Sequence, residues 1–224
     1  MPSQRKTKKD MIVEELRILI ETGGIARGSR IQQNELAARF ATSITPVREA
    51  LKQLEAEGLL TGEPHRGVRV VTAEPEEVKA IYIVRRLVEP YAFCRAARRV
   101  SRRELERAEG LIETMAAGGS GDRVQVGVTN RAFHFLFYDR CGLRTLTRQI
   151  EELWLGFPWD ILQVLEGRVE ESVHEHRKIL AAVVAGNLEE LGEAVESHIE
   201  QSYLALADHL GSDPARDPFH LDVD

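Results

Sequence analysis

The chain has 224 residues, of which 43% are hydrophobic and 29% charged, and its formal net charge is −6. This length suits two modest domains or one large one with packed cores. No apolar run approaches the ~20 residues of a membrane-spanning helix, and the basic start lacks the apolar segment of a secretory signal. We therefore expect a cytoplasmic protein with no membrane contact. Cys94 and Cys141 show no metal-type spacing and are expected as free thiols.

Charge is divided unevenly along the chain. Residues 1–72 contain 12 Lys and Arg against 9 Asp and Glu, whereas residues 73–224 contain 18 against 27. The positive first third can neutralise phosphates, while the acidic remainder repels DNA. A small positive excess predicts weak binding by one copy, so we expect a homodimer that reads two half-sites.

Residues 34–57 have the pattern of a helix-turn-helix. One helical pattern covers residues 34–40 and a second covers residues 45–57, with a short polar turn between them. Thr45 is expected to N-cap the second helix, and Pro46 to take its first position, where a missing N–H costs nothing. In this motif the second helix enters the major groove of DNA.

A β-wing is expected directly after the second helix. Gly58 suits the helix end, and two β-rich runs, residues 59–61 and 68–71, flank a polar tip at residues 63–67. The sequence therefore predicts a winged helix-turn-helix DNA-binding domain over residues 1–73.

The rest of the chain has helical patterns only. They cover residues 75–100, 101–118, 122–140, 143–155, 160–166, 168–185 and 188–209. Ser101 and Glu104 have the spacing of a capping box at the start of the second pattern. The predicted fold is mainly α: the winged domain is followed by an antiparallel six- or seven-helix bundle over residues 76–210, then a tail of residues 211–224.

Three histidines in this bundle are placed to meet. Asn130 and His134 are four residues apart, so they share one helix face. His176 lies 11 residues before Asn187, at the turn between the last two helices, and His198 lies 11 after it. At ~1.5 Å per residue, both stand about 16 Å from that turn, at one level. Three imidazoles suit Zn, Ni, Cu or Fe, although His176 and His198 could instead be ordinary surface or capping residues.

The first third also resembles a known family. The run SITPVREALKQLEAEGLL, with NELAARF before it and RGVRV after it, resembles the DNA-binding domain of GntR-family bacterial transcription regulators over roughly residues 10–72. Ile44 stands where that family usually has Arg, and its apolar side chain is expected to contact a thymine methyl. Asn34 stands at a family base-contacting position that is often Arg.

Several further residues are candidates for DNA contact. Arg48, one turn into the second helix, can reach a guanine edge or a phosphate; its alternative role is an ion pair on the helix surface. Ser43 and Thr45 are expected to donate hydrogen bonds to phosphates. Arg66 and Gly67, at the wing tip, are expected to approach the minor groove or the backbone.

The helical part resembles the ligand-binding domain, named FCD, of the FadR-type branch of the same family. The runs NRAFH, EHRKILAAVVAGN and SHIEQSYL carry this resemblance over roughly residues 76–210. It implies a divalent transition metal, zinc or nickel first, held by His134, His176, His198 and the residue at position 130. Many members have Asp there; Asn130 offers a neutral oxygen, which predicts weaker metal binding and a site more attractive to anions.

A small organic acid is the implied effector. An open metal position can take one carboxylate oxygen while an arginine holds the other. Arg86 matches a family position that often faces this pocket, with a surface ion pair as its alternative, and the adjacent Arg85 is expected to point elsewhere. Trp154 and Trp159 are expected to wall the cavity, with plain core packing as their alternative.

Together these features predict a ligand-responsive transcription regulator. We expect a dimeric repressor of a catabolic operon, bound to palindromic double-stranded operator DNA and released by a small carboxylate at the metal. One alternative is a metal-dependent enzyme, since three histidines with an open position can activate water. Glu175, however, is expected to point off the histidine face, which leaves no general base, so no enzyme is expected. The other alternative is a non-sensing structural DNA-binding protein.

Overall fold

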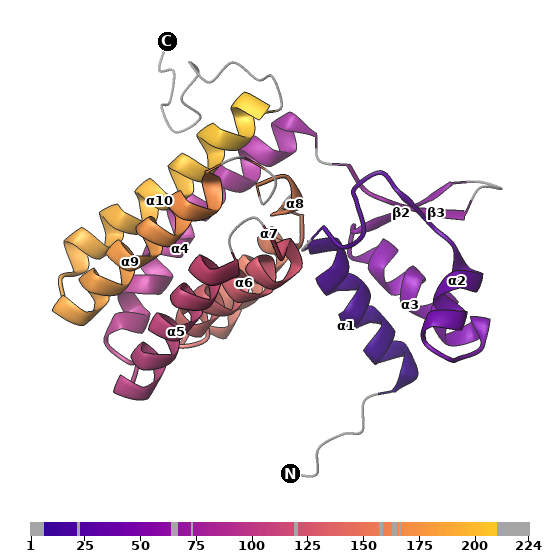
Figure 1. Cartoon of the computed structure of the whole chain (residues 1–224), viewed down its shortest axis with the longest axis horizontal. Coiled ribbons are helices and arrows are strands. Elements are labelled where there is room, and N and C mark those ends of the chain that lie inside the picture. The colour runs from indigo at the N-terminus through magenta and orange to yellow at the C-terminus, as the bar shows by residue number, and fades with distance from the viewer. Residues whose placement is uncertain are drawn as a thin grey trace. The chain divides into compact units, whose positions relative to one another are not determined.

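The structure is a computed structural model that falls into two compact units, Met1–Ala73 and Glu74–Asp224 (Figure 1). It describes residues 7–21, 23–63, 67–72, 74–118, 121–156, 159–162, 165 and 167–209. The predicted wing-tip contact Arg66 and the predicted tail 211–224 lie outside these residues. Within them, no helix combines the length and apolar character needed to cross a membrane.

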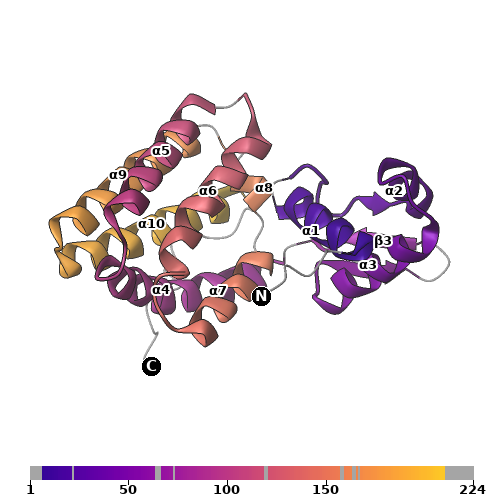
Figure 2. The same cartoon turned by 90° about the horizontal axis from the view of Figure 1, so that it is seen from below.

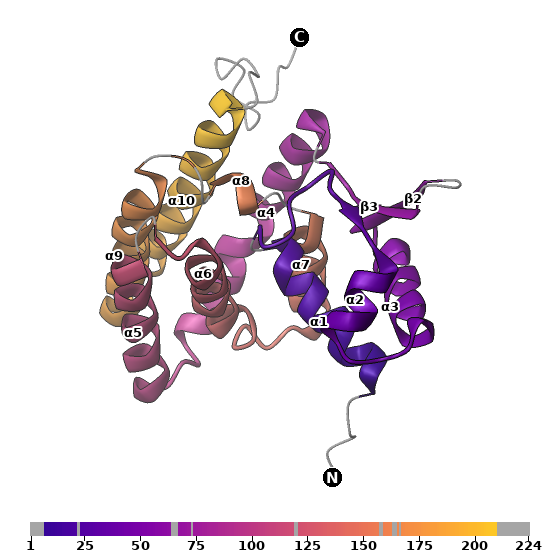
Figure 3. The same ribbon diagram turned by 45° about the vertical axis from the view of Figure 1, so that its right-hand side comes forward.

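The first unit combines helices with a small sheet. Its elements are α1 (Lys8–Glu21), β1 (Arg30–Ile31), α2 (Gln33–Arg39), α3 (Ile44–Ala56), β2 (Leu60–Glu63) and β3 (Gly67–Val70). The strands are antiparallel in the order β1-β3-β2, and Figure 3 shows β2 and β3 as the wing beside α3. The sequence did not indicate β1, because two residues are too short to show an alternating pattern. The predicted helix-turn-helix and wing are confirmed.

One interface holds the helix-turn-helix together. Apolar side chains of α1 and α3 bury each other at 0–2% exposure: Ile12, Leu16, Ile20, Val47, Ala50, Leu51 and Leu54. The turn before α3 is tight, since Ala41 has a φ of 45° and Thr42 donates its N–H to the Ala37 carbonyl at 3.0 Å. Gly58, with a φ of 77°, follows α3 as predicted.

The start of α3 differs from the prediction. The helix begins at Ile44 with Ser43 as N-cap, not at Pro46 with Thr45 as N-cap, and the Ser43 side chain makes no capping hydrogen bond. Pro46 is thus the third helical residue. The first four N–H groups of a helix have no partner within it, so proline is tolerated anywhere in that turn and marks the start only to within a turn.

The second unit is the predicted helical bundle. The helices are α4 (Pro75–Ala97), α5 (Arg102–Gly118), α6 (Arg123–Tyr138), α7 (Arg144–Gly156), α8 (Trp159–Leu162), α9 (Arg168–Ala185) and α10 (Leu188–His209). These seven, among the described residues, confirm the expected six or seven. The capping box is also present: Glu104 Oε2 accepts the Ser101 N–H at 2.8 Å, and Ser101 Oγ accepts the Glu104 N–H at 3.4 Å.

The packing of the bundle brings distant segments together. Helix α10 lies along both α4 and α9, and α5 lies along α6 and α9, as Figures 1 and 2 show. Gly186, with a φ of 70°, ends α9, and the chain turns back directly into α10. Cys94 and Cys141 are free thiols, as expected. The inward faces of α6, α9 and α10 thereby surround one buried volume.

Candidate metal and effector centre

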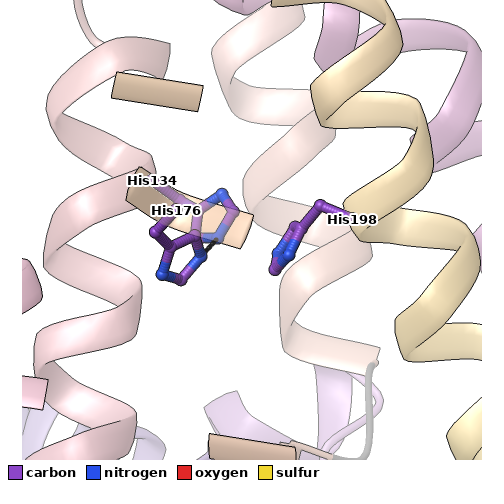
Figure 4. A group of neighbouring side chains, drawn as sticks. All are labelled: His134, His176 and His198. Atoms are coloured by element: carbon purple, nitrogen blue, oxygen red, sulfur yellow. Dashed lines mark hydrogen bonds between the residues drawn. The ribbon is translucent and has the colours of Figure 1, made fainter. Parts of the chain in front are cut away.

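Three histidines from three helices meet in this volume. His134 lies on α6, His176 on α9 and His198 on α10, with exposures of 0%, 0% and 3%. One ligand nitrogen of each ring lies within 4.8 Å of those of the other two. Figure 4 shows His134 and His176 side by side and His198 reaching toward them from α10. The rings therefore meet as the sequence spacing suggested, while the metal itself stays a prediction.

Hydrogen bonds tie the rings to one another and to their neighbours. His134 Nε2 lies 3.0 Å from His176 Nε2, and His134 Nδ1 lies 3.0 Å from the Tyr138 hydroxyl. His198 Nδ1 lies 2.6 Å from Glu175 Oε2. His134 and His198 are thus each fixed in orientation by a polar partner on Nδ1.

Burial lowers the pKa of all three imidazoles. For His134 and His176 the neighbouring positive groups lower the pKa further, well below its usual 6.5. For His198, burial lowers the pKa more than the nearby Glu175 carboxylate raises it. The rings are therefore neutral at pH 7, which is the form that binds metal ions.

The donor set fits a divalent transition metal. Within the described part of the chain, Asn130 Oδ1 is buried without a hydrogen-bond partner. Buried polar atoms normally have one, and a metal ion held by the histidines would supply it. Tetrahedral zinc–nitrogen bonds of about 2.0–2.1 Å place two nitrogens on one ion about 3.4 Å apart. A pair at the 4.8 Å limit would therefore have to approach by about 1.4 Å, shared between the two rings.

A buried carboxylate, Glu89 on α4, organises the groups behind His134. Its Oε2 accepts the Tyr138 hydroxyl at 2.8 Å, and its Oε1 accepts Arg85 Nε at 2.7 Å and Trp154 Nε1 at 3.0 Å. Arg85 is 0% exposed, and its guanidinium lies over the rings of Tyr82, Trp154 and Trp159 at 4.8–5.4 Å. The expectation that Arg85 points away is wrong, because position 85 lies one helical turn from Glu89 on the inner face of α4.

A second buried carboxylate supports His198. Glu175 accepts both Arg168 Nη1 at 2.9 Å and Arg168 Nη2 at 2.7 Å, besides its contact with His198. Burial raises the pKa of Glu175, but the hydrogen bonds from His198 and Arg168 outweigh it and the pKa is lowered. The expectation that Glu175 points off the histidine face is therefore wrong: its long side chain bends toward α10.

A small cavity adjoins the histidines. It measures about 40 Å³, and its polar lining includes Asn130, Arg168, His198 and Ser202, with Trp159 among the apolar walls. Arg168 Nη2 also donates to Ser202 Oγ at 2.8 Å. The cavity therefore has a cationic group and a candidate metal ligand facing one space.

The three residues predicted to bind an effector lie in different places. Trp159 lines the cavity, whereas Trp154 is 2% exposed and bonds to Glu89. The Arg86 side chain is 29% exposed, and its Nη2 lies 3.7 Å from Glu196 Oε2. The surface ion pair considered for Arg86 is thus present, with a partner on α10 instead of a neighbour on its own helix.

The predicted DNA-contacting residues are grouped at one end of the helix-turn-helix. Ser43, Ile44, Thr45 and Arg48 are all exposed at the start of α3, as is Asn34 in α2. Arg48 Nε lies 3.4 Å from Gln33 Oε1 of α2, which differs from the glutamate or lysine neighbours considered for it. Gly67, with a φ of 91°, is exposed at the start of β3.

The sequence reasoning did not single out three polar residues of this centre, Glu89, Tyr138 and Arg168, and it placed a fourth, Glu175, wrongly. A signal existed for two of them, because Tyr138 follows His134 by four residues and Glu89 follows Arg85 by four, so each pair shares a helix face. Arg168 and Glu175 are seven residues apart, two turns of α9. Their link to His198 depends on the packing of α9 against α10, which no local pattern shows.

The fold and the exposed start of α3 define a DNA-binding regulator with a separate helical receptor. Two family models match the chain: "Bacterial regulatory proteins, gntR family" over residues 8–70 and "FCD domain" over residues 80–201. The chain belongs to the GntR family and carries an FCD domain. It is therefore a transcription regulator with a ligand-sensing domain, and not an enzyme.

Known relatives agree with this assignment. The chain is 30% identical over 213 residues to the probable D-xylose utilization operon transcriptional repressor of Paenarthrobacter nicotinovorans, covering 90% of this chain and 87% of that one. It is 25% identical over 200 residues to the regulator McbR of Escherichia coli, covering 87% and 90%. The solved structure of E. coli McbR/YncC has a TM-score of 0.84 at 24% identity, covering 92% of this chain and all of that one, which shows a shared fold.

Proposed function

We propose that this protein is a dimeric repressor of a catabolic operon, released from palindromic operator DNA by a small carboxylate bound at a divalent metal, zinc or nickel first. The proposal is supported by relatives named as repressors of D-xylose utilization and gluconate operons. The observation that carries it is the buried, neutral set of His134, His176 and His198 beside a cavity with a cationic wall.

The exposed start of α3 supports DNA reading. Arg48, exposed and with its Nε 3.4 Å from Gln33 Oε1 of α2, can reach a guanine edge or phosphate. Ile44, 39% exposed in an otherwise polar turn, would contact a thymine methyl. Ser43 and Thr45 would position the helix on phosphates, and Gly67 would let the wing backbone come close.

The metal would be held by His134, His176 and His198, with the Asn130 oxygen as a fourth, neutral ligand. When bound, such an ion supplies a positive charge and an open position for an anionic oxygen. Arg168 lies on the cavity wall and has five N–H donors, so beside those held by Glu175 and Ser202 it can give another to the second carboxylate oxygen. This role, first expected of Arg86, is better supported for Arg168 because Arg168 lines the cavity.

The lining of the cavity suggests how binding reaches the DNA-binding unit. Asn130 of α6, Arg168 of α9 and His198 of α10 all face the cavity. A ligand bound there would contact all three helices and would favour the arrangement of them that it fits best. It changes DNA affinity only through that difference in binding between two arrangements.

A dimer is supported by an apolar face on α4. Val84, Leu87 and Tyr91, spaced by three and four residues, are 41%, 73% and 54% exposed. We expect Leu87→Glu to give a monomer in sedimentation equilibrium and to weaken operator binding at least tenfold, because both half-sites are needed. The exposed Val184→Glu, on α9, is the control; dissociation by both variants or by neither would contradict an α4 interface.

The central experiment combines DNA binding with effector screening. An operator is first selected from random duplex DNA with the purified full chain. Small mono- and dicarboxylates are then added with zinc present, and again after chelation. We expect one class of acid to release the DNA only when zinc is present. Release that survives chelation would reject the metal-linked effector, and release by no acid would favour a non-sensing DNA-binding protein.

A further inference from the structure

We propose that two arginine-anchored carboxylates, Glu89 and Glu175, keep the protons of His134 and His198 on Nδ1, so that His176 is the one histidine whose proton must move when a metal enters. The inference rests on the metal site of the proposed function and concerns the groups behind the ligands. Glu89 acts through Tyr138, whereas Glu175 acts directly.

We call the hydrogen-bonded chain from Arg85 through Glu89 and Tyr138 to His134 the first relay. Arginine and tryptophan side chains only donate hydrogen bonds, so the bonds from Arg85 Nε and Trp154 Nε1 require Glu89 Oε1 to accept. Arg85 Nη2 donates to the other oxygen, Glu89 Oε2, at 3.3 Å, and the same Oε2 accepts the Tyr138 proton at 2.8 Å. Tyr138 has one proton, so its oxygen must accept from His134 Nδ1, 3.0 Å away. His134 Nε2 is left with its lone pair facing the other rings.

The second relay runs from Arg168 through Glu175 to His198. It is shorter, and it also ends with the histidine donating from Nδ1. Arg168 holds both oxygens of Glu175 in a fork, at 2.9 and 2.7 Å. Glu175 is therefore an acceptor, and His198 Nδ1, 2.6 Å from Glu175 Oε2, must donate. His198 Nε2 is likewise left with a lone pair. A carboxylate behind an imidazole also makes the ring a better metal ligand.

His176 differs from the other two. Its Nδ1 is buried without a partner in the described part of the chain, and its Nε2 lies 3.0 Å from His134 Nε2. Since His134 Nε2 has no proton, that contact is a hydrogen bond only if His176 donates from Nε2. For both Nε2 lone pairs to hold a metal, this proton would have to leave Nε2 of His176. The neutral ring would then carry it on Nδ1, so one N–H bond would break, another would form and no net proton would be released.

The arrangement separates rigid ligands from an adaptable one. His134 and His198 have their protons on Nδ1 before any metal is bound, so no proton on these two rings has to move on binding. Without metal, His176 donates a hydrogen bond from Nε2 to His134. When that proton moves to Nδ1, the Nε2 lone pair becomes available to a metal. Glu89, Tyr138, Glu175 and Arg168 are positioning residues for this purpose.

Nitrogen-15 NMR of the histidine side chains tests the proton positions in the full chain without metal. Each ring nitrogen has a distinct shift for the protonated, bare and metal-bound state. We expect Nδ1–H on His134 and His198 and Nε2–H on His176, and after zinc addition Nδ1–H on all three. A proton on Nε2 of His134 or His198, or a zinc complex that retains Nε2–H on His176, would overturn the inference.

A pair of tyrosine variants tests the first relay. Tyr138→Phe removes the acceptor of His134 Nδ1–H, so we expect zinc affinity, measured by competition with a chromophoric chelator, to fall about 10–100-fold and His134 to lose its single proton position. Tyr91→Phe removes a tyrosine hydroxyl from the same helix as Glu89, but Tyr91 is 54% exposed and its hydroxyl accepts from Arg95 Nη1, so it should change neither. Unchanged zinc affinity and an unchanged His134 in Tyr138→Phe would overturn the relay. If wild type binds no zinc while the expected protons are found, the proposed metal effector site fails and the relay stands.

Discussion

The two units of this chain build their functional surfaces in opposite ways. In the first unit the candidate DNA contacts Ser43, Ile44, Thr45 and Arg48 lie within six residues at the start of one helix. In the second unit, His134, His176 and His198 come from three helices and from residues 42 and 22 positions apart. The first surface needs only that α3 forms and is held in place. The second exists only when the whole bundle is packed.

The largest expected effect comes from breaking the packing behind α3. Leu54 is 0% exposed between α1 and α3, so Leu54→Ala should destabilise the first unit by about 2–5 kcal/mol through lost burial and the cavity left behind. Operator binding should be lost as that unit unfolds, while zinc affinity stays as in wild type. Circular dichroism melting and chelator competition measure the two units separately. Loss of zinc binding in the same variant would show that the second surface depends on the first.

The next effect concerns a single contact on the local surface. Arg48→Ala should weaken operator binding by about 1–3 kcal/mol, roughly 5–150-fold, if the guanidinium forms a two-pronged contact with a guanine. Anisotropy titrations with the selected operator measure the loss.

Arg48→Lys is the matched control because it keeps the charge and removes the planar fork. Partial loss with relaxed sequence preference would indicate a base contact, and full recovery would indicate a phosphate contact. Unchanged binding by Arg48→Ala would remove Arg48 from the interface.

The contrast between the units also explains what the sequence could predict. The helix-turn-helix, the capping box at Ser101 and the level of His176 and His198 all follow from spacing along one helix or across one short turn. The errors involve long side chains. Arg85 and Glu175 were assigned by which face their Cα positions suggest, yet each reaches a partner through several rotatable bonds chosen by the surrounding packing. The buried network of Arg85, Glu89 and Trp154 joins α4 to α7, and such a meeting has no periodic signature.

Acid should weaken the second unit selectively. Burial holds the pKa values of His134 and His176 below the usual value of 6.5. At a pH between the folded and unfolded pKa values, the unfolded chain therefore binds more protons than the folded chain. The resulting stability is present above about pH 6.5 and is lost as the pH falls toward the folded pKa values, by about 1.4 kcal/mol per pH unit for each histidine.

Denaturant unfolding of metal-free protein from pH 8 to 5 measures this slope. His176→Gln should flatten it, and His174→Gln, at an exposed position two residues away, should leave it unchanged. Equal slopes in all three proteins would mean that other groups carry the acid sensitivity.

The smallest expected effect concerns the backbone of the local surface. Ala41, in the turn between α2 and α3, has a φ of 45°, the left-handed region that a Cβ disfavours. Glycine adopts it without that cost, so Ala41→Gly should raise the free energy of unfolding of the first unit by about 0.5–1 kcal/mol, even though glycine also gives the unfolded chain more freedom. Ala38→Gly, three residues earlier within α2, should do the opposite and cost about 1 kcal/mol. Denaturant unfolding measures both variants. A gain in the free energy of unfolding for Ala41→Gly and a loss for Ala38→Gly would show that Ala41 strains the turn. Two losses of similar size would mean that Ala41 is unstrained in solution.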